Sequence, residues 1–452
     1  MKYITIFCLF FSFSSFSQVK KYDLAIKNVK IFDVKTGVVG PDQVILIKKG
    51  IIEDIVRNTN KFAAEKTIDA KGKLVTPSFI DAHIHPTDVF GDYDKAPEYL
   101  VKDSLNIYRQ HLTDAYLPYG ITTVMMMGQP EKWLIPILGW SINPRPNHIN
   151  IYTAGAAIIS KEDRPTYIGH VVVDSPLAAK KKIEAYYQLG IRHIKLYWRL
   201  RDPEFKIAFK TADSLGMRVY GHIDQNVMTM DHTLDIGLKN YEHLVTIAYS
   251  VIKEKKDWDS FNQEFTANYG EVKTQSDILK MFLEMFRYID EHKKAEINIL
   301  IDKLASRNAT FSTSINILAE LFQSGSPGDS VSLVRQQNRT KENFETFMKY
   351  VRQMQEKGIK LRIGTDMAKG GKSLQAEQLL LFKTGFSISS ILQICTINGA
   401  QALGIDSKVG IIEKGSRADL LIWHRSPFDS ANNFLSDKII IKDGVVYEPT
   451  IN

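Results

Sequence analysis

Hydrophobic and polar residues alternate along both ends of the chain. Short segments with a period of two occupy residues 22–69 and 418–447, and turn sequences such as Lys49-Gly50 and Asp443-Gly444 separate them. This pattern is typical of β-strands joined by tight turns. Neither end has enough strands to bury a sheet face alone, so we expect the two termini to build one small β-sandwich. Its two parts are predicted at residues 18–74 and 405–452.

The middle of the chain has a different pattern, in which apolar strand-like segments alternate with helical ones. The predicted strands are residues 75–86, 120–127, 149–155, 191–197, 217–222, 240–244, 309–314 and 360–366. Alternating strands and helices indicate an α/β fold with a parallel sheet. Eight such strands close most simply into a (β/α)8 TIM barrel, which we place at residues 75–404.

One connection in this barrel is too long for a single helix. Residues 248–307, between the sixth and seventh predicted strands, are rich in helix formers and carry apolar residues at helical spacing. A connection that follows a barrel strand leaves from the face that carries barrel active sites. The sequence therefore predicts a helical insert that serves as a lid or wall, with an oligomer contact as the alternative.

Composition narrows the function classes. The chain has 452 residues and a formal net charge of +7, spread over many lysine, glutamate and aspartate residues without a long basic run. This charge pattern gives no reason to expect nucleic-acid binding. The length accommodates a barrel and a smaller companion domain.

The first 17 residues differ from the rest. Lys2 precedes an apolar segment at residues 4–11, and serines follow up to Ser17. This order is typical of a secretory signal peptide, so we expect an exported protein, periplasmic or secreted. No later segment is long and apolar enough to predict a membrane span. Cleavage after Ser17 would leave Cys395 as the remaining cysteine, so no internal disulfide is expected.

The first predicted barrel strand carries the clearest chemical motif. At strand period Asp81, His83 and His85 point to one side, while Ile80, Ala82 and Ile84 point to the other. Two imidazoles about 6–7 Å apart along a strand can turn onto one cation. Imidazole is a common ligand of zinc and similar metals. The motif therefore predicts a metal site.

Residues of suitable chemistry recur at the ends of other predicted strands. Lys195 lies near the end of the fourth strand, and His222, His243 and Asp366 end the fifth, sixth and eighth. In a barrel the carboxyl ends of the strands meet at one face, where catalytic residues gather. These four residues are therefore expected to join His83 and His85.

In the order His-x-His, Lys, His, His, Asp, this set resembles the binuclear enzymes of the amidohydrolase superfamily, and the prolidase-like and imidazolonepropionase-like branches are nearest in pattern. The resemblance extends to residues 396–404 and 409–422, although Ser78 stands where the first motif usually has glycine. It implies two divalent ions, with zinc favoured. His83, His85 and Asp366 would hold one ion, and His222 and His243 the other. Lys195, carboxylated by carbon dioxide, would bridge them.

The resemblance also implies a reaction. A hydroxide bridging the two ions would attack an amide-type C–N bond, and Asp366 would act as base and then pass the proton to the leaving nitrogen. Candidate substrate residues are Tyr197, Arg199 and His170, and Arg199 suits a substrate carboxylate. Gln375 replaces the histidine of a family motif. The expected partner is therefore a small molecule with a carboxylate, such as a dipeptide or an N-acyl amino acid, or else a cyclic amide.

Two other functions remain open at this point. The same site would serve a lactonase or phosphotriesterase, because the nucleophile attacks any sufficiently polarised ester. A barrel that has become a catalytically silent binding protein is the third reading, although a complete ligand set argues against it. The sequence does not decide whether the protein forms a homo-oligomer.

Overall fold

The computed structural model describes residues 21–85, 106–161, 170–223, 227–323 and 331–448. The predicted signal peptide, residues 1–17, lies outside the described residues, and export therefore stays a prediction. Among the described helices, none combines the length and apolarity needed to cross a bilayer.

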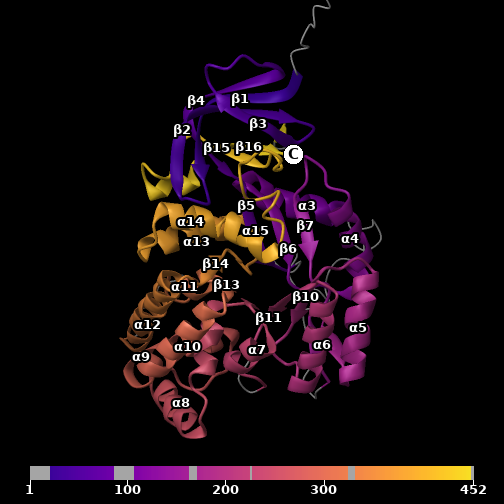
Figure 1. Ribbon diagram of the computed structural model, residues 1–452. Coiled ribbons are helices and arrows are strands. Elements are labelled where there is room, and N and C mark those ends of the chain that lie inside the picture. Colours follow the sequence, from indigo (N-terminus) through magenta and orange to yellow (C-terminus); the bar gives the residue numbers. More distant parts are fainter. Residues whose placement is uncertain (1–20, 86–105, 162–169, 224–226, 324–330, 449–452) are drawn as a thin grey trace, which may run out of the picture.

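Both ends of the chain contribute to one small sheet domain, drawn in indigo and yellow in Figure 1. Its strand order is β17-β16-β15-β4-β1-β2-β3. The N-terminal strands are β1 (Lys21–Asp33), β2 (Val38–Lys48), β3 (Ile51–Arg57) and β4 (Ala63–Pro77), and the C-terminal strands are β15 (Leu420–Trp423), β16 (Lys438–Lys442) and β17 (Val445–Val446). The predicted origin of this domain from both termini is confirmed.

The terminal sheet folds over its own apolar face. Ile52 N donates to Ser416 O at 2.8 Å, so β3 meets the segment that leads into β15. Buried aliphatic residues from both termini, including Ile26, Ile45 and Ile422, fill the space inside. Their period-two spacing places them on one face of each strand, so strands from both termini are required to enclose this core.

The barrel strands pair in parallel around a ring. They are β5 (Phe79–Ile84), β6 (Ile121–Met126), β7 (Asn150–Thr153), β8 (Ile158–Ser160), β10 (His193–Leu196), β11 (Arg218–Gly221), β12 (Asn240–Tyr241), β13 (Thr310–Ser312) and β14 (Lys360–Arg362). The ring closes where Ala82 N donates to Ile363 O at 2.8 Å and Asp366 N donates to His83 O at 3.0 Å. The predicted α/β barrel is confirmed.

One barrel strand is interrupted, and the predicted strand at residues 149–155 covers only its first part. The third barrel strand consists of β7, which pairs with β6, and β8, which pairs with β10. Gly155 lies in the break with φ +69°, and a Cβ there would come within 2.7 Å of the Tyr186 ring. Only glycine fits this turn without strain. An additional short strand, β9 (Val171–Val173), pairs with β8 in the following loop.

Helices surround the barrel and connect its strands. They are α3 (Asn106–Tyr116), α4 (Leu134–Ile142), α5 (Pro176–Gln188), α6 (Asp202–Ser214), α7 (Met230–Ile236), α10 (Lys294–Ser306), α11 (Asn316–Gln323), α12 (Val331–Glu356), α13 (Gly371–Lys383), α14 (Ile388–Ile394) and α15 (Ile397–Leu403). Short 3₁₀ helices cover Leu117–Tyr119 (η2), Glu131–Trp133 (η3), Leu244–Ser250 (η4) and Ala431–Leu435 (η5).

Two further helices lie in the long connection between β12 and β13. They are α8 (Lys255–Tyr269) and α9 (Gln275–His292), and α9 begins with a capping box formed by Thr274 and Asp277. Figure 1 places α8 at the end of the molecule opposite the terminal sheet. Helix α9 packs against α12 and against η4, which directly follows His243. A role of these helices as a lid stays a prediction.

A buried ion pair fastens α9 to α12. Arg339 Nε donates to both carboxylate oxygens of Glu284, at 2.9 and 3.1 Å, and Asn343 also donates to this carboxylate. The Glu284 side chain is only 1% exposed. Removing one partner of such a pair leaves a buried charge without compensation.

We therefore expect Arg339→Met to destabilise the helical layer by about 3–5 kcal/mol. Urea titration followed by far-UV ellipticity would measure the loss. The control is Arg339→Met combined with Glu284→Met, which removes both charges and should recover most of the stability. A double variant as unstable as the single one would contradict this explanation.

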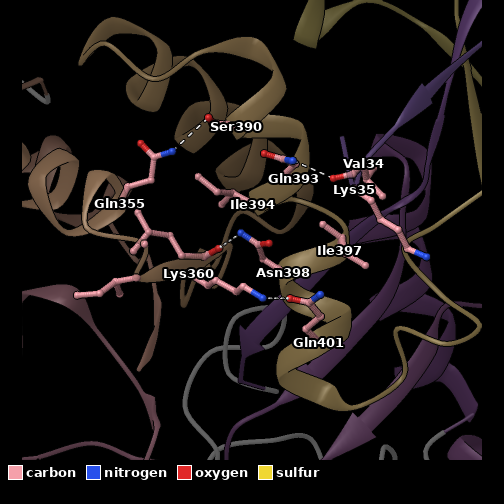
Figure 2. Close-up of a pocket in the computed structure, with 13 residues that line it drawn as sticks. Val34, Lys35, Gln355, Lys360, Ser390, Gln393, Ile394, Ile397, Asn398 and Gln401 are labelled. Atoms are coloured by element: carbon pink, nitrogen blue, oxygen red, sulfur yellow. Dashed lines mark hydrogen bonds between the residues drawn. The ribbon is translucent and has the colours of Figure 1, made fainter. Parts of the chain in front are cut away.

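A polar cavity of about 360 Å³ separates the barrel from the terminal sheet. Figure 2 shows that residues from both parts meet there, since Gln393 Nε2 donates to Val34 O at 2.8 Å. Within the barrel, Lys360 Nζ donates to Gln401 Oε1 at 2.7 Å. Lys360 begins β14, whereas Asp366 follows the end of that strand. The cavity therefore lies at the opposite end of the barrel from the predicted chemistry, and its polar groups serve the contact between the domains.

Candidate metal centre

The carboxyl ends of the barrel strands bring the predicted residues together. His83 Nε2 lies 3.2 Å from His85 Nε2 and 3.4 Å from Lys195 Nζ. Asp366 Oδ1 lies 3.6 Å from His85 Nε2, and Asp366 Oδ2 lies 3.8 Å from His243 Nε2. His83, His85 and Asp366 offer one ligand atom each, all within 4.8 Å of one another, which makes them a candidate metal site.

The four histidine rings form a continuous row. The ring centres are 5.1 Å apart for His85 and His83, 4.7 Å for His83 and His243, and 4.7 Å for His243 and His222. The sequence separates these residues by up to 160 positions, and the barrel places them side by side because their strands end at one face.

Hydrogen bonds fix which nitrogen of each ring faces the cluster. His85 Nδ1 donates to Gly128 O at 3.2 Å. His243 Nδ1 lies 3.2 Å from Ser314 Oγ, and since that hydroxyl donates to Gly364 O, the ring nitrogen must supply the other hydrogen. The Nε2 lone pairs of these two rings are thus free to face the cluster, as metal ligation requires.

In His222 the candidate ligand atom is the other ring nitrogen, Nδ1. Its Nδ1 is buried and has no hydrogen-bond partner within the described part of the chain. A buried polar nitrogen without a partner is costly, and a bound cation would satisfy it. This orphaned atom, beside the converging nitrogens of the other rings, shows that the residues fit a metal ion.

The charge state of the cluster also fits a cation. Burial lowers the pKa values of His83, His85 and His222 well below the usual range, and it lowers the pKa of His243 to about 3. The positive charge of Lys195 acts in the same direction. All four rings are therefore neutral near pH 7, which is the form that binds metals.

The pKa of Asp366 responds to the same buried surroundings. Burial raises the pKa of Asp366 to about 7; Lys195 opposes this change, while Glu242 and Asp81 add to it. A divalent ion beside this carboxylate would favour its ionised form.

Backbone strain is concentrated at the same strand ends. His243, Ser314 and Asp366 have φ values of 62°, 46° and 50°, in the left-handed region that non-glycine residues rarely adopt. Such conformations cost about 1–3 kcal/mol each and persist where neighbouring contacts hold them. Asp81 provides one such contact, because its carboxylate accepts from Thr365 N at 3.1 Å and from Thr365 Oγ1 at 2.7 Å.

Two residues of the site escaped the sequence analysis. Glu242 Oε2 lies 2.5 Å from His83 Nδ1, and Arg362 donates to the other oxygen of the same carboxylate. Strand period would turn Glu242 away from the site that His243 faces. The positive φ of His243 breaks this alternation, so both side chains reach the cluster. A signal was present at Arg362, a charged residue between the apolar Leu361 and Ile363.

The three predicted substrate residues lie in different surroundings. Tyr197 is next to the cluster, since its ring centre is 5.0 Å from that of His222 and 5.2 Å from Lys195 Nζ. His170 packs on Tyr197 with ring centres 4.6 Å apart. Arg199 is buried, and its Cζ lies 6.0 Å from the ring centre of Trp198. Gln375, in contrast, donates to Phe434 O in the terminal domain at 3.4 Å.

Solved structures of related shape support the fold. An Xaa-Pro dipeptidase with bound methionine superposes with a TM-score of 0.66 at 20% identity, covering 94% of this chain and all of that one. A putative prolidase from Bifidobacterium longum gives 0.66 at 18% identity, covering 95% of each chain. An ochratoxinase from A. niger gives 0.65 at 13% identity, covering 96% of this chain and 98% of that one. At these identities the likeness shows the fold alone.

Sequence relatives match over short segments. A dihydroorotase from Sulfurihydrogenibium sp. is 52% identical over 44 residues, 10% of each chain. An adenine deaminase from Geobacillus kaustophilus is 30% identical over 105 residues, 23% of this chain and 15% of that one. This chain thus spans only a small part of the length of these curated relatives.

The profile of the Amidohydrolase family, in contrast, matches residues 74–446. That range contains the barrel, all six residues of the predicted metal cluster and the C-terminal strands of the terminal sheet. The chain belongs to the amidohydrolase family.

Proposed function

We propose that this protein is a metal-dependent hydrolase of amide-type C–N bonds that uses two divalent ions, with zinc favoured. The observation that carries the proposal is the row of four neutral imidazoles that ends strands β5, β11 and β12 and converges with Asp366 and Lys195. Imidazole and carboxylate donors at such spacing suit zinc. When bound, the ions would lower the pKa of a water and polarise the scissile carbonyl.

Asp366 has the position for proton transfer. Its two carboxylate oxygens point to different parts of the cluster, one toward His85 and the other toward His243. A carboxylate between the two halves can accept the proton of the attacking water and pass it to the leaving nitrogen. The left-handed backbone of Asp366, held by its bond to His83 O, fixes that orientation before substrate arrives.

Lys195 is proposed to be carboxylated. A free ammonium has no lone pair for a cation, whereas a carbamate offers two oxygens like a carboxylate. Its Nζ lies between the histidine row and the Tyr197 ring, 3.4 Å from His83 Nε2. Without carboxylation, four neutral rings and one aspartate would surround two dications. A carbamate on Lys195 would add negative charge and balance the ions better.

The substrate class follows from the neighbouring residues and from related proteins. The aromatic wall of His170, Tyr197 and Trp198 borders the cluster, and Arg199 lies beyond it on the same connection. Similar chains include a protein described as an Xaa-Pro dipeptidase and one described as an L-hydantoinase. We therefore propose a small substrate that carries a carboxylate close to the scissile amide.

A substrate screen with the metal-loaded protein tests this proposal. Dipeptides and N-acyl amino acids should be hydrolysed, and chelation should abolish the reaction. Preference for lactones or phosphotriesters would move the protein to that class of hydrolase. Metal binding without turnover of any amide or ester would favour the binding protein.

Arg199→Met should weaken the binding of free-acid substrates. If Arg199 holds the substrate carboxylate, the change removes a charge-assisted hydrogen bond of about 1.5–3 kcal/mol and raises KM about 10- to 150-fold with little effect on kcat. Amide-capped substrates provide the control, because they lack the carboxylate and should show no such change. Equal losses on both substrates would exclude this role of Arg199.

A further inference from the structure

A chain of three fully buried side chains extends from the metal cluster into the barrel. His83, Glu242 and Arg362 are each 0% exposed. His83 Nδ1 contacts one carboxylate oxygen of Glu242 at 2.5 Å, and Arg362 Nη2 donates to the other. Each oxygen of Glu242 thus has a separate partner, and the carboxylate cannot rotate without losing one of them.

Arg362 is itself held from several sides. Its Nη2 also donates to Tyr241 O at 3.1 Å, and its Nη1 donates to Thr310 Oγ1 at 2.7 Å. These partners belong to β13, which pairs with β14, and to β12, which pairs with β13. The guanidinium is therefore fixed relative to the barrel wall, and it fixes Glu242 in turn.

The arrangement decides the tautomer of His83. The Glu242 carboxylate accepts from Arg362 through one oxygen and offers the other as an acceptor to His83 Nδ1, so His83 carries its hydrogen on Nδ1 and leaves a lone pair on Nε2. Nε2 is the atom that lies 3.2 Å from His85 Nε2, inside the cluster.

We propose that Glu242, held by Arg362, is a positioning residue that keeps His83 in its metal-binding tautomer. This inference rests on the two-ion site proposed above. A buried ion pair gives little net stability compared with apolar residues of similar size, so stability alone does not account for it. The left-handed conformation of His243 lets its side chain and that of the preceding Glu242 both reach His83.

Glu242→Gln is the sharpest test, because it keeps the shape of the side chain. Glutamine has one acceptor oxygen, and Arg362 requires it. The amide nitrogen then faces His83 Nδ1 and favours the other tautomer, whose hydrogen lies on the metal-binding Nε2. Loss of such an outer partner typically weakens metal binding 10- to 100-fold.

The two proposed ions make the readout specific. We expect Glu242→Gln to weaken the ion held by His83 10- to 100-fold and to change the other by less than about threefold, in stepwise competition with a chromogenic chelator. Ser314→Ala is the matched control, since it removes the partner of His243 and should weaken the other ion. Glu242→Asp keeps the charge and should restore part of the affinity. Equal weakening at both sites, or none, would overturn the inference.

A measurement on the unaltered protein covers the case in which Glu242→Gln fails to fold. Nitrogen-15 NMR of the metal-free, histidine-labelled chain, assigned with a His83→Gln variant, should show His83 protonated at Nδ1. Protonation at Nε2 would overturn the inference. Failure of the wild-type chain to bind metal would instead count against the proposed function, and the tautomer result would still stand.

Discussion

Asp366→Asn is expected to lower kcat by about 10³-fold or more. The change keeps the size of the side chain but removes a ligand charge and the group proposed to move the proton. General acid–base groups alone account for about 10²–10⁴ in rate. Because Asp366 contacts both halves of the histidine row, the variant should also bind the ions more weakly. Steady-state kinetics at saturating metal would separate the two effects.

The control for this variant is a comparison of its thermal stability with that of the wild type. Asp366 N still donates to His83 O in the asparagine variant, and Thr365 still bonds to Asp81, so the strand end should keep its conformation. Thermal unfolding of the metal-free proteins should therefore agree closely. If the variant retained more than a tenth of the wild-type kcat with both ions bound, Asp366 would not be the proton-transfer group.

The second large effect is expected at Lys195. Lys195→Ala should remove the proposed bridge, lower metal affinity at least about 100-fold and reduce activity accordingly, since even outer partners of ligands are worth 10- to 100-fold. Short carboxylic acids such as acetate or propionate should restore part of the activity, because they supply two oxygens in the space that the side chain leaves.

The rescue distinguishes a bridge from a merely buried lysine. His222→Ala serves as the comparison, because the acids do not replace an imidazole and should not restore its activity. Equal rescue of both variants would point to a general effect of the acids. An unmodified amine at Lys195 in a protein that holds two ions would contradict the carboxylation directly.

The sequence predicted the architecture well because its apolar residues recur with clear strand and helix periods. The termini alternate apolar and polar residues because one face of their sheet is buried. The middle of the chain repeats apolar strands and helices because the barrel buries its strands beneath a layer of helices. The predicted ligands were also brought together, since strand ends share one face of a barrel. Side-chain direction was predicted correctly for His83 and His85, whose Nε2 atoms both face the cluster.

Prediction failed where the backbone leaves the strand period. The positive φ of His243 breaks the strand alternation, so that His243 and Glu242 both reach the site, and that of Ser314 accompanies a hydroxyl beside His243 Nδ1. Neither conformation has a signature in the residue types, because non-glycine residues rarely adopt it. Likewise, the third barrel strand resumes beyond Gly155 as β8, where the sequence predicted the strand to end. The supporting contacts of the site therefore required the structure.

Metal content is the measurement that tests the central proposal most directly. The mature chain, loaded with zinc and freed of excess by mild dialysis, should contain about two divalent ions per chain by elemental analysis. His85→Ala should reduce that number, whereas a surface change such as Lys255→Ala should leave it unchanged. A content of one ion that persists in zinc excess, or of none, would contradict a two-ion hydrolase.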